Sequence, residues 1–284
     1  MRPAPFADSA APIEPLVGRM DLEGFLLFPG LLGAGEVATI RAQLDPVLEA
    51  TPRGRNDFEG FTTRRVYALL AHAPATAVLV EHPLLLALAA RLLEPNFLLS
   101  AHLAIQIFDG ETAQAWHFDD GFYRQPMPRP PCGMSAIWSL DPFNDANGAT
   151  ELIPGSHKWG EARPPDFEAA AVKATAPAGS LLVFPGNLTH RGGANTRAPA
   201  RLAVTTQFCQ PWLRQQENMM MGLGATAKAL SPTVQALIGY SLHPPFMGQV
   251  DGMHPLRLID EAFVGLRRRG VRQPLGSSSP TPVQ

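Results

Sequence analysis

The chain has 284 residues, of which 45% are hydrophobic, so it is long enough to bury a substantial core in one large domain or two small ones. Its formal net charge of -2 gives no positive excess for binding nucleic acid or an anionic membrane surface, and this favours a small-molecule partner. Two cysteines are too few for a disulfide framework.

The N-terminal part of the chain predicts a leader followed by a strand and helices. Residues 1–20 are broken by proline and charge and lack a secretory signal, so we expect a flexible leader and a cytoplasmic protein. The stretch "GFLLFPGLL" from Gly24 predicts a buried strand, and "GAGEVATIRAQLDPVLEA" from Gly33 predicts an amphipathic helix. Two further helical segments at 74–81 and 83–93 complete a helical front at 33–93, and the second is too short to span a bilayer.

The character of the chain changes at about residue 97. Apolar segments such as "FLLSAHLAIQIF", "CGMSAIWSL", "GSLLVF" and "RLAVTTQF" are separated by Gly, Pro, Asn and Asp, with no helix between successive segments. This pattern favours a β-sandwich or barrel core at about 97–210. We expect a helical region at 213–270, a low-complexity disordered tail at 276–284, and a single domain at 21–275. Within that region Met219–Met221 indicate core packing or an apolar lid.

The stretch "AQAWHFDDGF" at 113–122 places His117 two residues before Asp119. On a strand these side chains would lie on one face, about 6.5 Å apart at the backbone, within reach of one metal ion. His190 follows 73 residues later, and two histidines with one carboxylate form the facial triad of non-haem iron. The alternatives are a half-buried histidine beside a turn carboxylate, and His157 as a rival ligand, although its Pro-Gly-Ser turn favours a loop residue.

Arg201 lies at the start of the strand that follows His190. A facial triad leaves iron positions open for O2 and a chelating co-substrate such as 2-oxoglutarate. The far carboxylate of 2-oxoglutarate needs a permanently charged, bidentate partner, which Arg201 can supply. Arg197 competes for this role but falls within the turn "GANTRAP", and a solvated arginine at a strand start is the alternative for Arg201.

These motifs together are similar to those of one known family. The order W-H-x-D, N-G-x-x-x-x-I-P-G-S-H, P-G-x-x-x-H-x-G and an arginine eleven residues after the second histidine resembles the phytanoyl-CoA dioxygenase family of Fe(II)- and 2-oxoglutarate-dependent oxygenases. The similar segments run from about Gly24 to about Phe208. The resemblance implies a mainly β fold with flanking helices, built on a double-stranded β-helix (jelly roll, cupin-like) core.

The resemblance also implies roles for individual residues. His117, Asp119 and His190 would hold Fe(II), and Arg201 would bind the C5 carboxylate of 2-oxoglutarate. Gln114 would contact the C1 carboxylate end and Thr150 would contribute a hydroxyl. Related halogenases have Ala or Gly in place of Asp119, so its presence argues against halogenation. Candidate substrate contacts are Tyr67, Phe118, Asp120, Phe122 and Trp138, with support of the metal ligands as the alternative for Asp120.

The expected function is oxidation of a C–H bond in a small, largely apolar molecule, with O2 and 2-oxoglutarate consumed and succinate and CO2 released. Hydroxylation is the expected outcome, and desaturation or ring closure requires only a different positioning of the substrate. No segment clearly provides for an acyl-CoA. Two alternatives remain open: a cupin-type metal-dependent oxygenase without 2-oxoglutarate, and a non-catalytic jelly roll that binds a small ligand.

Overall fold

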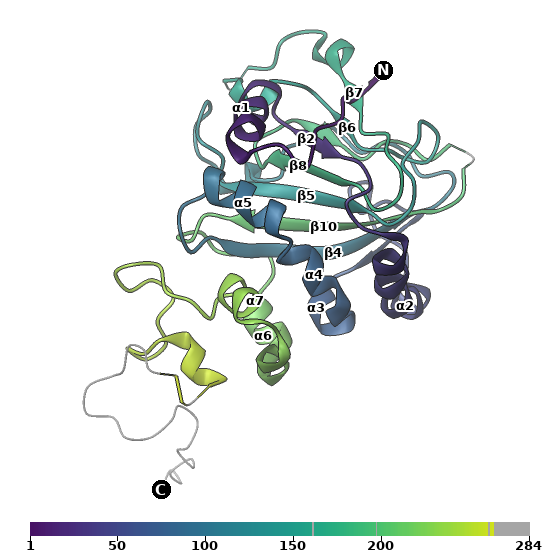
Figure 1. Ribbon diagram of the computed structural model, residues 1–284. Coiled ribbons are helices and arrows are strands. Elements are labelled where there is room, and N and C mark those ends of the chain that lie inside the picture. The colour runs from purple at the N-terminus through teal and green to yellow at the C-terminus, as the bar shows by residue number, and fades with distance from the viewer. Residues whose placement is uncertain (161, 197, 261, 264–284) are drawn as a thin grey trace, which may run out of the picture.

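The computed structural model describes residues 1–160, 162–196, 198–260 and 262–263 (Figure 1). Arg197, residues 264–270 of the predicted helical region and the predicted tail at 276–284 lie outside the described residues. The described part consists of two β-sheets with helices packed against the larger one.

The larger sheet has six strands in the order β2-β8-β5-β10-β4-β3, and β8, β5, β10 and β4 lie side by side in Figure 1. Their bounds are β2 Leu26–Phe28, β3 Thr63–Val66, β4 Leu98–Ile107, β5 Gly133–Ser139, β8 Leu181–Pro185 and β10 Arg201–Cys209. All pairs in this sheet are antiparallel. β-Branched and other apolar residues dominate these segments, and each predicted strand is present.

The smaller sheet has four short strands in the order β1-β7-β6-β9. Their bounds are β1 Arg2–Pro3, β6 Glu151–Leu152, β7 Val172–Lys173 and β9 His190–Arg191. Leu152 and Val172 of this sheet pack against Leu27, Leu182 and Phe184 of the larger sheet, which forms the core between the two sheets. This two-sheet arrangement confirms the predicted jelly-roll core.

Helices cover the other face of the larger sheet. They are α1 Ile13–Glu23, α2 Ala34–Ala50, α3 Leu69–His72, α4 Ala77–Val80, α5 Pro83–Leu92, α6 Met219–Leu223 and α7 Pro232–Leu237. Short 3-10 helices are η1 Pro74–Thr76, η2 Gly121–Tyr123, η3 Ser156–Lys158, η4 Phe167–Ala170, η5 Gly224–Ala229 and η6 Pro255–Leu258. Leu44 of α2, Leu88 of α5 and Val204 of β10 belong to this second core. Because successive side chains of a strand point to opposite faces, each strand of the larger sheet directs every second side chain toward the helices and the others toward the smaller sheet.

The flexible leader predicted at 1–20 is wrong. Residues 2–3 form β1 beside β7, and helix α1 begins at Ile13. Leu16 and Met20, four residues apart on α1, are buried in the helix-facing core. Pro15 in the first turn of α1 is compatible with this helix, because the first backbone N–H groups of a helix have no intrahelical partner.

The C-terminal region is more irregular than the helical segment predicted at 213–270. After β10 its described part, up to residue 263, contains α6, η5, α7 and η6, none longer than six residues. Met219 and Met220 pack in the core, whereas Met221 is exposed, so core packing is confirmed for the first two. No described residue beyond Glu217 lines the cavity that contains His117, Asp119 and His190, which leaves the predicted methionine lid without support.

Among the described residues, no single helix has the length and apolar character to cross a bilayer. In the part of the chain that the structure describes, one pair of helical segments, Pro74–Val80 and Pro83–Leu92, bent by 52°, meets these criteria jointly. Leu79, Val80 and Leu85 of this pair are buried in the helix-facing core.

Candidate metal centre

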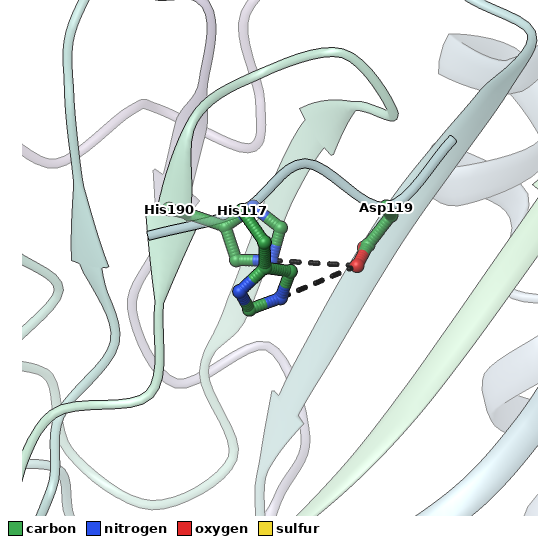
Figure 2. A group of neighbouring side chains, drawn as sticks. All are labelled: His117, Asp119 and His190. Carbon is green, nitrogen blue, oxygen red and sulfur yellow. Dashed lines mark ion pairs between the residues drawn. The ribbon is translucent and has the colours of Figure 1, made fainter. Parts of the chain in front are cut away.

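Two chain segments far apart in sequence bring the three predicted ligands together. His117 pairs with His190 of β9 as an antiparallel bridge, with backbone N–O distances of 3.0 and 2.8 Å. Asp119 approaches both imidazoles from the turn that follows His117 (Figure 2). Candidate ligand atoms of the three residues all lie within 4.8 Å of one another, as one metal ion requires.

The imidazole hydrogen bonds leave the ligand atoms free. Nδ1 of His117 lies 2.9 Å from the carbonyl of Ala115, and Nδ1 of His190 lies 2.9 Å from the carbonyl of Leu188. A carbonyl only accepts, so each Nδ1 donates its proton and each neutral ring keeps its lone pair on Nε2. These Nε2 atoms lie 3.8 and 3.5 Å from Oδ1 of Asp119, so the donor set fits a non-haem iron ion.

One premise of the sequence prediction is wrong. His117 and Asp119 were expected on one strand face, but His117 makes only an isolated bridge and Asp119 lies in a turn. The turn, rather than strand periodicity, carries the carboxylate back toward the imidazoles. The predicted grouping of His117, Asp119 and His190 is present in spite of this.

The electrostatics of the site favour an ionised carboxylate. Burial alone opposes the charge, but His190, His117 and the Ser135 hydroxyl outweigh burial and hold the pKa of Asp119 below its usual value. The Ser135 hydroxyl donates to Oδ2 of Asp119 at 2.5 Å, which leaves Oδ1 facing the imidazoles. Burial and the neighbouring His190 lower the pKa of His117, so its ring stays neutral and able to bind metal.

The three residues line a cavity of about 460 Å³ between the two sheets. The predicted site residues that also line it are Tyr67, Gln114, Phe118, Phe122, Thr150 and Arg201. Apolar side chains of β4, β5 and β10 form much of its wall, namely Ala101, Leu103, Ile105, Ile107, Ile137 and Ala203. A largely apolar wall with a few convergent polar groups is typical of a small-molecule site.

Arg201 places a buried positive charge in the wall of the cavity. It begins β10, is 3% exposed, stacks 4.1 Å over the Phe143 ring and donates to the carbonyl of Gly148. No described carboxylate forms an ion pair with it, and its Nε has no hydrogen-bond partner there. Burial lowers the pKa of Arg201 to about 9, and a bound carboxylate would offset this cost.

Arg65 is a second cavity arginine that the sequence reasoning missed. It lies on β3, where its Nε and Nη2 donate to the carbonyls of Glu59 and Phe58 at 2.9 and 3.1 Å. Burial lowers its pKa, and no described carboxylate forms an ion pair with it. Side chains alternate between the two faces of a strand, and this alternation along "TTRRVY" could have indicated that Arg65 is a site residue, because Arg65 and Thr63 share one strand face and both line the cavity.

Gln114 and Thr150 are positioned beside this cavity as expected, although their roles stay predictions. The Gln114 amide donates to the carbonyl of Phe58 at 2.8 Å and accepts from the backbone N–H of Gly192 at 3.0 Å. Gln114 therefore ties the 54–60 loop to the chain beside His190. Thr150 is 3% exposed and immediately precedes β6.

Two predicted substrate contacts are contradicted. Trp138 is fully buried on the helix-facing side of β5, where it packs near His82, because it alternates with the cavity-lining Ile137. Asp120 points away from the cavity and forms a bidentate ion pair with Arg129 at 2.6 and 2.9 Å. The Asp120 carboxylate also accepts from the backbone N–H of Cys132, which fixes the turn that carries Asp119.

His157 lies against α1 rather than in the metal cluster. It belongs to η3, and its Nε2 lies 2.9 Å from the carbonyl of Asp21. Within the described residues, His117, Asp119 and His190 are the one group found with metal-binding geometry.

Comparisons with known proteins agree with this geometry. A family model described as phytanoyl-CoA dioxygenase (PhyH) matches residues 20–203, more than half of the chain. The chain belongs to the phytanoyl-CoA dioxygenase family. It is accordingly a non-haem iron dioxygenase that uses 2-oxoglutarate and O2, which confirms the predicted enzyme class and cofactors.

Curated relatives of this family include fungal dioxygenases. Dioxygenase ALT11 of Alternaria alternata is 28% identical over 227 residues, which cover 72% of this chain and 74% of the relative. Dioxygenase swnH1 of Arthroderma benhamiae is 24% identical over 279 residues, which cover 89% and 91% of the two chains. The similarity to these proteins therefore extends over most of both sequences.

Solved structures share the fold. The epimerase SnoN, in complex with Fe3+, alpha ketoglutarate and nogalamycin RO, superposes with a TM-score of 0.59 at 23% identity, covering 70% of this chain and 83% of that protein. HygX from Streptomyces hygroscopicus, with nickel, 2-oxoglutarate and hygromycin B bound, has a TM-score of 0.58 at 18% identity, covering 72% and 90%. At these identities the likeness supports the jelly-roll fold alone.

Proposed function

We propose that this dioxygenase hydroxylates a C–H bond of a small, largely apolar molecule, with 2-oxoglutarate converted to succinate and CO2. The observation that carries the proposal is the shared cavity, in which His117, Asp119 and His190 converge beside Arg201, a buried cation with no ion pair to a carboxylate of the described residues. Bound iron would supply the activation of O2. The residues of the chain hold the metal, orient both organic molecules and exclude water.

Arg201 favours 2-oxoglutarate over the cupin-type alternative that dispenses with it. We assign the C5 carboxylate to Arg201, whose guanidinium is held by Phe143 and Gly148 and can form two parallel hydrogen bonds to a carboxylate. Gly148 packs closely against the chain beside Arg201, since a Cβ at this position would lie 2.9 Å from the Gly193 carbonyl. An enzyme without a dicarboxylate co-substrate would gain nothing from burying this charge.

The remainder of the cavity is proposed to hold the oxidised substrate. Aromatic side chains surround its opening: Phe58, Tyr67 and Phe122 line the cavity and are each more than half exposed. The Phe58 ring also meets the His117 ring edge-on at 5.2 Å, close to the metal ligands. Exposed aromatic rings next to a metal centre offer apolar contact area to an entering molecule at low entropic cost.

The charge of the cavity does not favour a coenzyme A thioester. Among the described lining residues the cations are Arg65 and Arg201, whereas the acidic residues are Asp57, Glu59, Glu111, Asp119 and Glu217. Coenzyme A would bring several phosphate charges, which need a cluster of cations. The bound molecules of SnoN and HygX, nogalamycin RO and hygromycin B, further support a free small-molecule substrate for this fold.

The proposal can be tested by adding Fe(II) and then 2-oxoglutarate to the protein without oxygen, and recording the visible charge-transfer band of the chelated co-substrate. We expect the band in the wild type and in His157→Ala, a matched control because His157 contacts α1. We expect no band in His117→Ala. A band that survives in His117→Ala, or that is absent in the wild type with iron bound, would contradict the proposed site.

The reaction itself can be tested by screening small molecules for stimulated release of succinate. A hydroxylase should yield a product that has gained one oxygen atom, and this atom should carry label from isotopic O2. Products that have lost two hydrogens instead would show that the substrate is positioned for desaturation or ring closure, and hydroxylation would be rejected.

A further inference from the structure

The two metal-binding histidines lie on chain segments with very little regular β-pairing. β9 contains only His190 and Arg191, and His117 is joined to it by one isolated bridge. On either side of this bridge the Gln114 N–H donates to the Gly192 carbonyl at 3.0 Å and the Asp120 N–H donates to the Gly186 carbonyl at 3.1 Å. These bonds are spaced too widely to form a continuous ladder, which would hold two strands more firmly in register. Side-chain contacts must contribute to keeping the two imidazoles aligned.

The strand register places a second row of residues directly beside the ligands. Leu152 pairs with His190 and Glu151 with Arg191, while Lys173 of β7 pairs with Glu151. Because His117 pairs with His190 in antiparallel sense, Trp116 lies opposite Arg191. We name Lys173, Glu151, Arg191 and Trp116 the outer row, since their side chains alternate with those that face the cavity and core.

The contacts of the outer row converge on Arg191. Its Nε donates to Oε2 of Glu151 at 2.7 Å, and its guanidinium carbon lies 4.2 Å from the centre of the Trp116 ring. Glu151 is 4% exposed and has Lys173 Nζ 3.8 Å from its other oxygen, so this ion pair is well shielded from solvent. Trp116 is further held by an edge-on contact with Phe167 at 5.9 Å.

We propose that Arg191 is a positioning residue for the metal centre, which joins the strand of His190 to the segment of His117 through Glu151 and Trp116. The inference rests on the proposed metal-binding role of the two histidines. Arg191 connects three neighbouring chain segments by one ion pair and one cation–π contact. Fixing Trp116 and Arg191 limits the direction of the adjacent residue in each segment, which is a ligand: His117 follows Trp116 and His190 precedes Arg191.

A purely stabilising role would have a different signature. An arginine that only supports the fold would change the unfolding temperature and leave the metal site of the folded protein intact. A positioning residue changes the affinity and coordination geometry of the metal at temperatures where the protein is fully folded, because outer contacts of metal ligands contribute about 10- to 100-fold in affinity.

The test uses Co(II) as a spectroscopic probe of the metal-free full-length protein. We expect Arg191→Ala to bind Co(II) about tenfold more weakly, with an altered visible Co(II) spectrum, and Arg191→Lys to recover part of the affinity, since lysine can still pair with Glu151. Trp116→Leu should also weaken Co(II) binding, and it replaces Arg191→Ala in the test if that variant does not fold. Arg163→Ala is the matched control, because Arg163 lies over Phe167 at 5.7 Å, is exposed, and has no hydrogen bond or ion pair with the two ligand segments among the described residues.

Unchanged Co(II) affinity and spectrum in folded Arg191→Ala or Trp116→Leu would overturn the proposal, whatever happens to the unfolding temperature. An equal loss in Arg163→Ala would also overturn it, because the effect would then come from the aromatic cluster in general. Absence of Co(II) binding by the wild type would reject the metal site and this inference together. Wild-type binding that is lost in His117→Ala but kept in Arg191→Ala would reject the positioning role alone.

Discussion

Replacement of Arg201 by glutamine is expected to weaken 2-oxoglutarate binding about a hundredfold while leaving metal binding unchanged. The guanidinium is buried, has no described ion-pair partner and does not contact the triad. Its pKa of about 9, lowered by burial, still leaves it cationic at neutral pH. Glutamine keeps a hydrogen-bond donor but loses the charge and the bidentate geometry.

The magnitude follows from the interactions that would be lost. Each hydrogen bond to a charged group contributes about 1.5 to 3 kcal/mol, and the variant keeps at most one of two in weakened form. A net loss of about 3 kcal/mol corresponds to roughly a hundredfold increase in Kd. At a concentration where 2-oxoglutarate stabilises the wild type by about 2.7 kcal/mol, it would stabilise the variant by about 0.4 kcal/mol.

Two assays measure the effect. Anaerobic titration of the charge-transfer band gives the apparent Kd of 2-oxoglutarate directly. Thermal unfolding at a fixed concentration gives the second reading, where a shift of about 5 °C in the wild type should fall to about 1 °C in the variant. Arg64→Gln is the matched control, because it removes the same charge from the other face of β3, where Arg64 stacks 5.2 Å over Phe108.

The reasoning would be refuted if Arg201→Gln kept the wild-type titration midpoint. A large loss of 2-oxoglutarate affinity in Arg65→Gln, with none in Arg201→Gln, would show that Arg65 and not Arg201 binds the C5 carboxylate. A loss of equal size in Arg64→Gln would show that the overall charge, and not a bound carboxylate, governs the affinity.

Three further outcomes are expected. Ser135→Ala removes the hydroxyl that orients Asp119 and should weaken Co(II) binding about tenfold in a spectroscopic titration, whereas an unchanged Kd would deny the hydroxyl this role. Burial lowers the pKa of His102 to about 3, so below about pH 6.5 the unfolded chain binds a proton at this residue that the folded protein does not. The free energy of unfolding should therefore fall by about 1.4 kcal/mol per pH unit as the pH falls from about 6.5 toward 3. Urea unfolding at several pH values measures this slope, which should be smaller in His102→Gln. Trp138→Ala should lower the free energy of unfolding by about 3 to 5 kcal/mol without changing the Co(II) Kd, and a change in Kd would place Trp138 back at the site.

Much of the site could be predicted because its chemistry needs particular residue types. The sequence alone shows two histidines, one carboxylate and an arginine at the start of a strand. The structure brings these four residues to one cavity. Most strands of the larger sheet were also predictable, since short apolar segments bounded by turn residues are a local sequence signal for buried strands.

The direction in which a side chain points was predicted less well. Trp138 and Ile137 are adjacent and both apolar, and only the packing of helices on one face of the larger sheet decides that Trp138 is core and Ile137 is cavity wall. Asp119 and Asp120 are likewise adjacent carboxylates, and the position of Arg129 decides which of them turns away from the imidazoles.

The metal chemistry, the class of co-substrate and the β-rich core could thus be predicted from the residues alone, because ligand type and local periodicity are properties of the chain. Three features required knowledge of the folded domain: residues 2–3 join the smaller sheet, Arg65 faces the cavity, and Arg191 lies on the strand of His190 opposite Glu151. These depend on contacts between segments distant in sequence, whose register is set by burial and strand pairing over the whole domain.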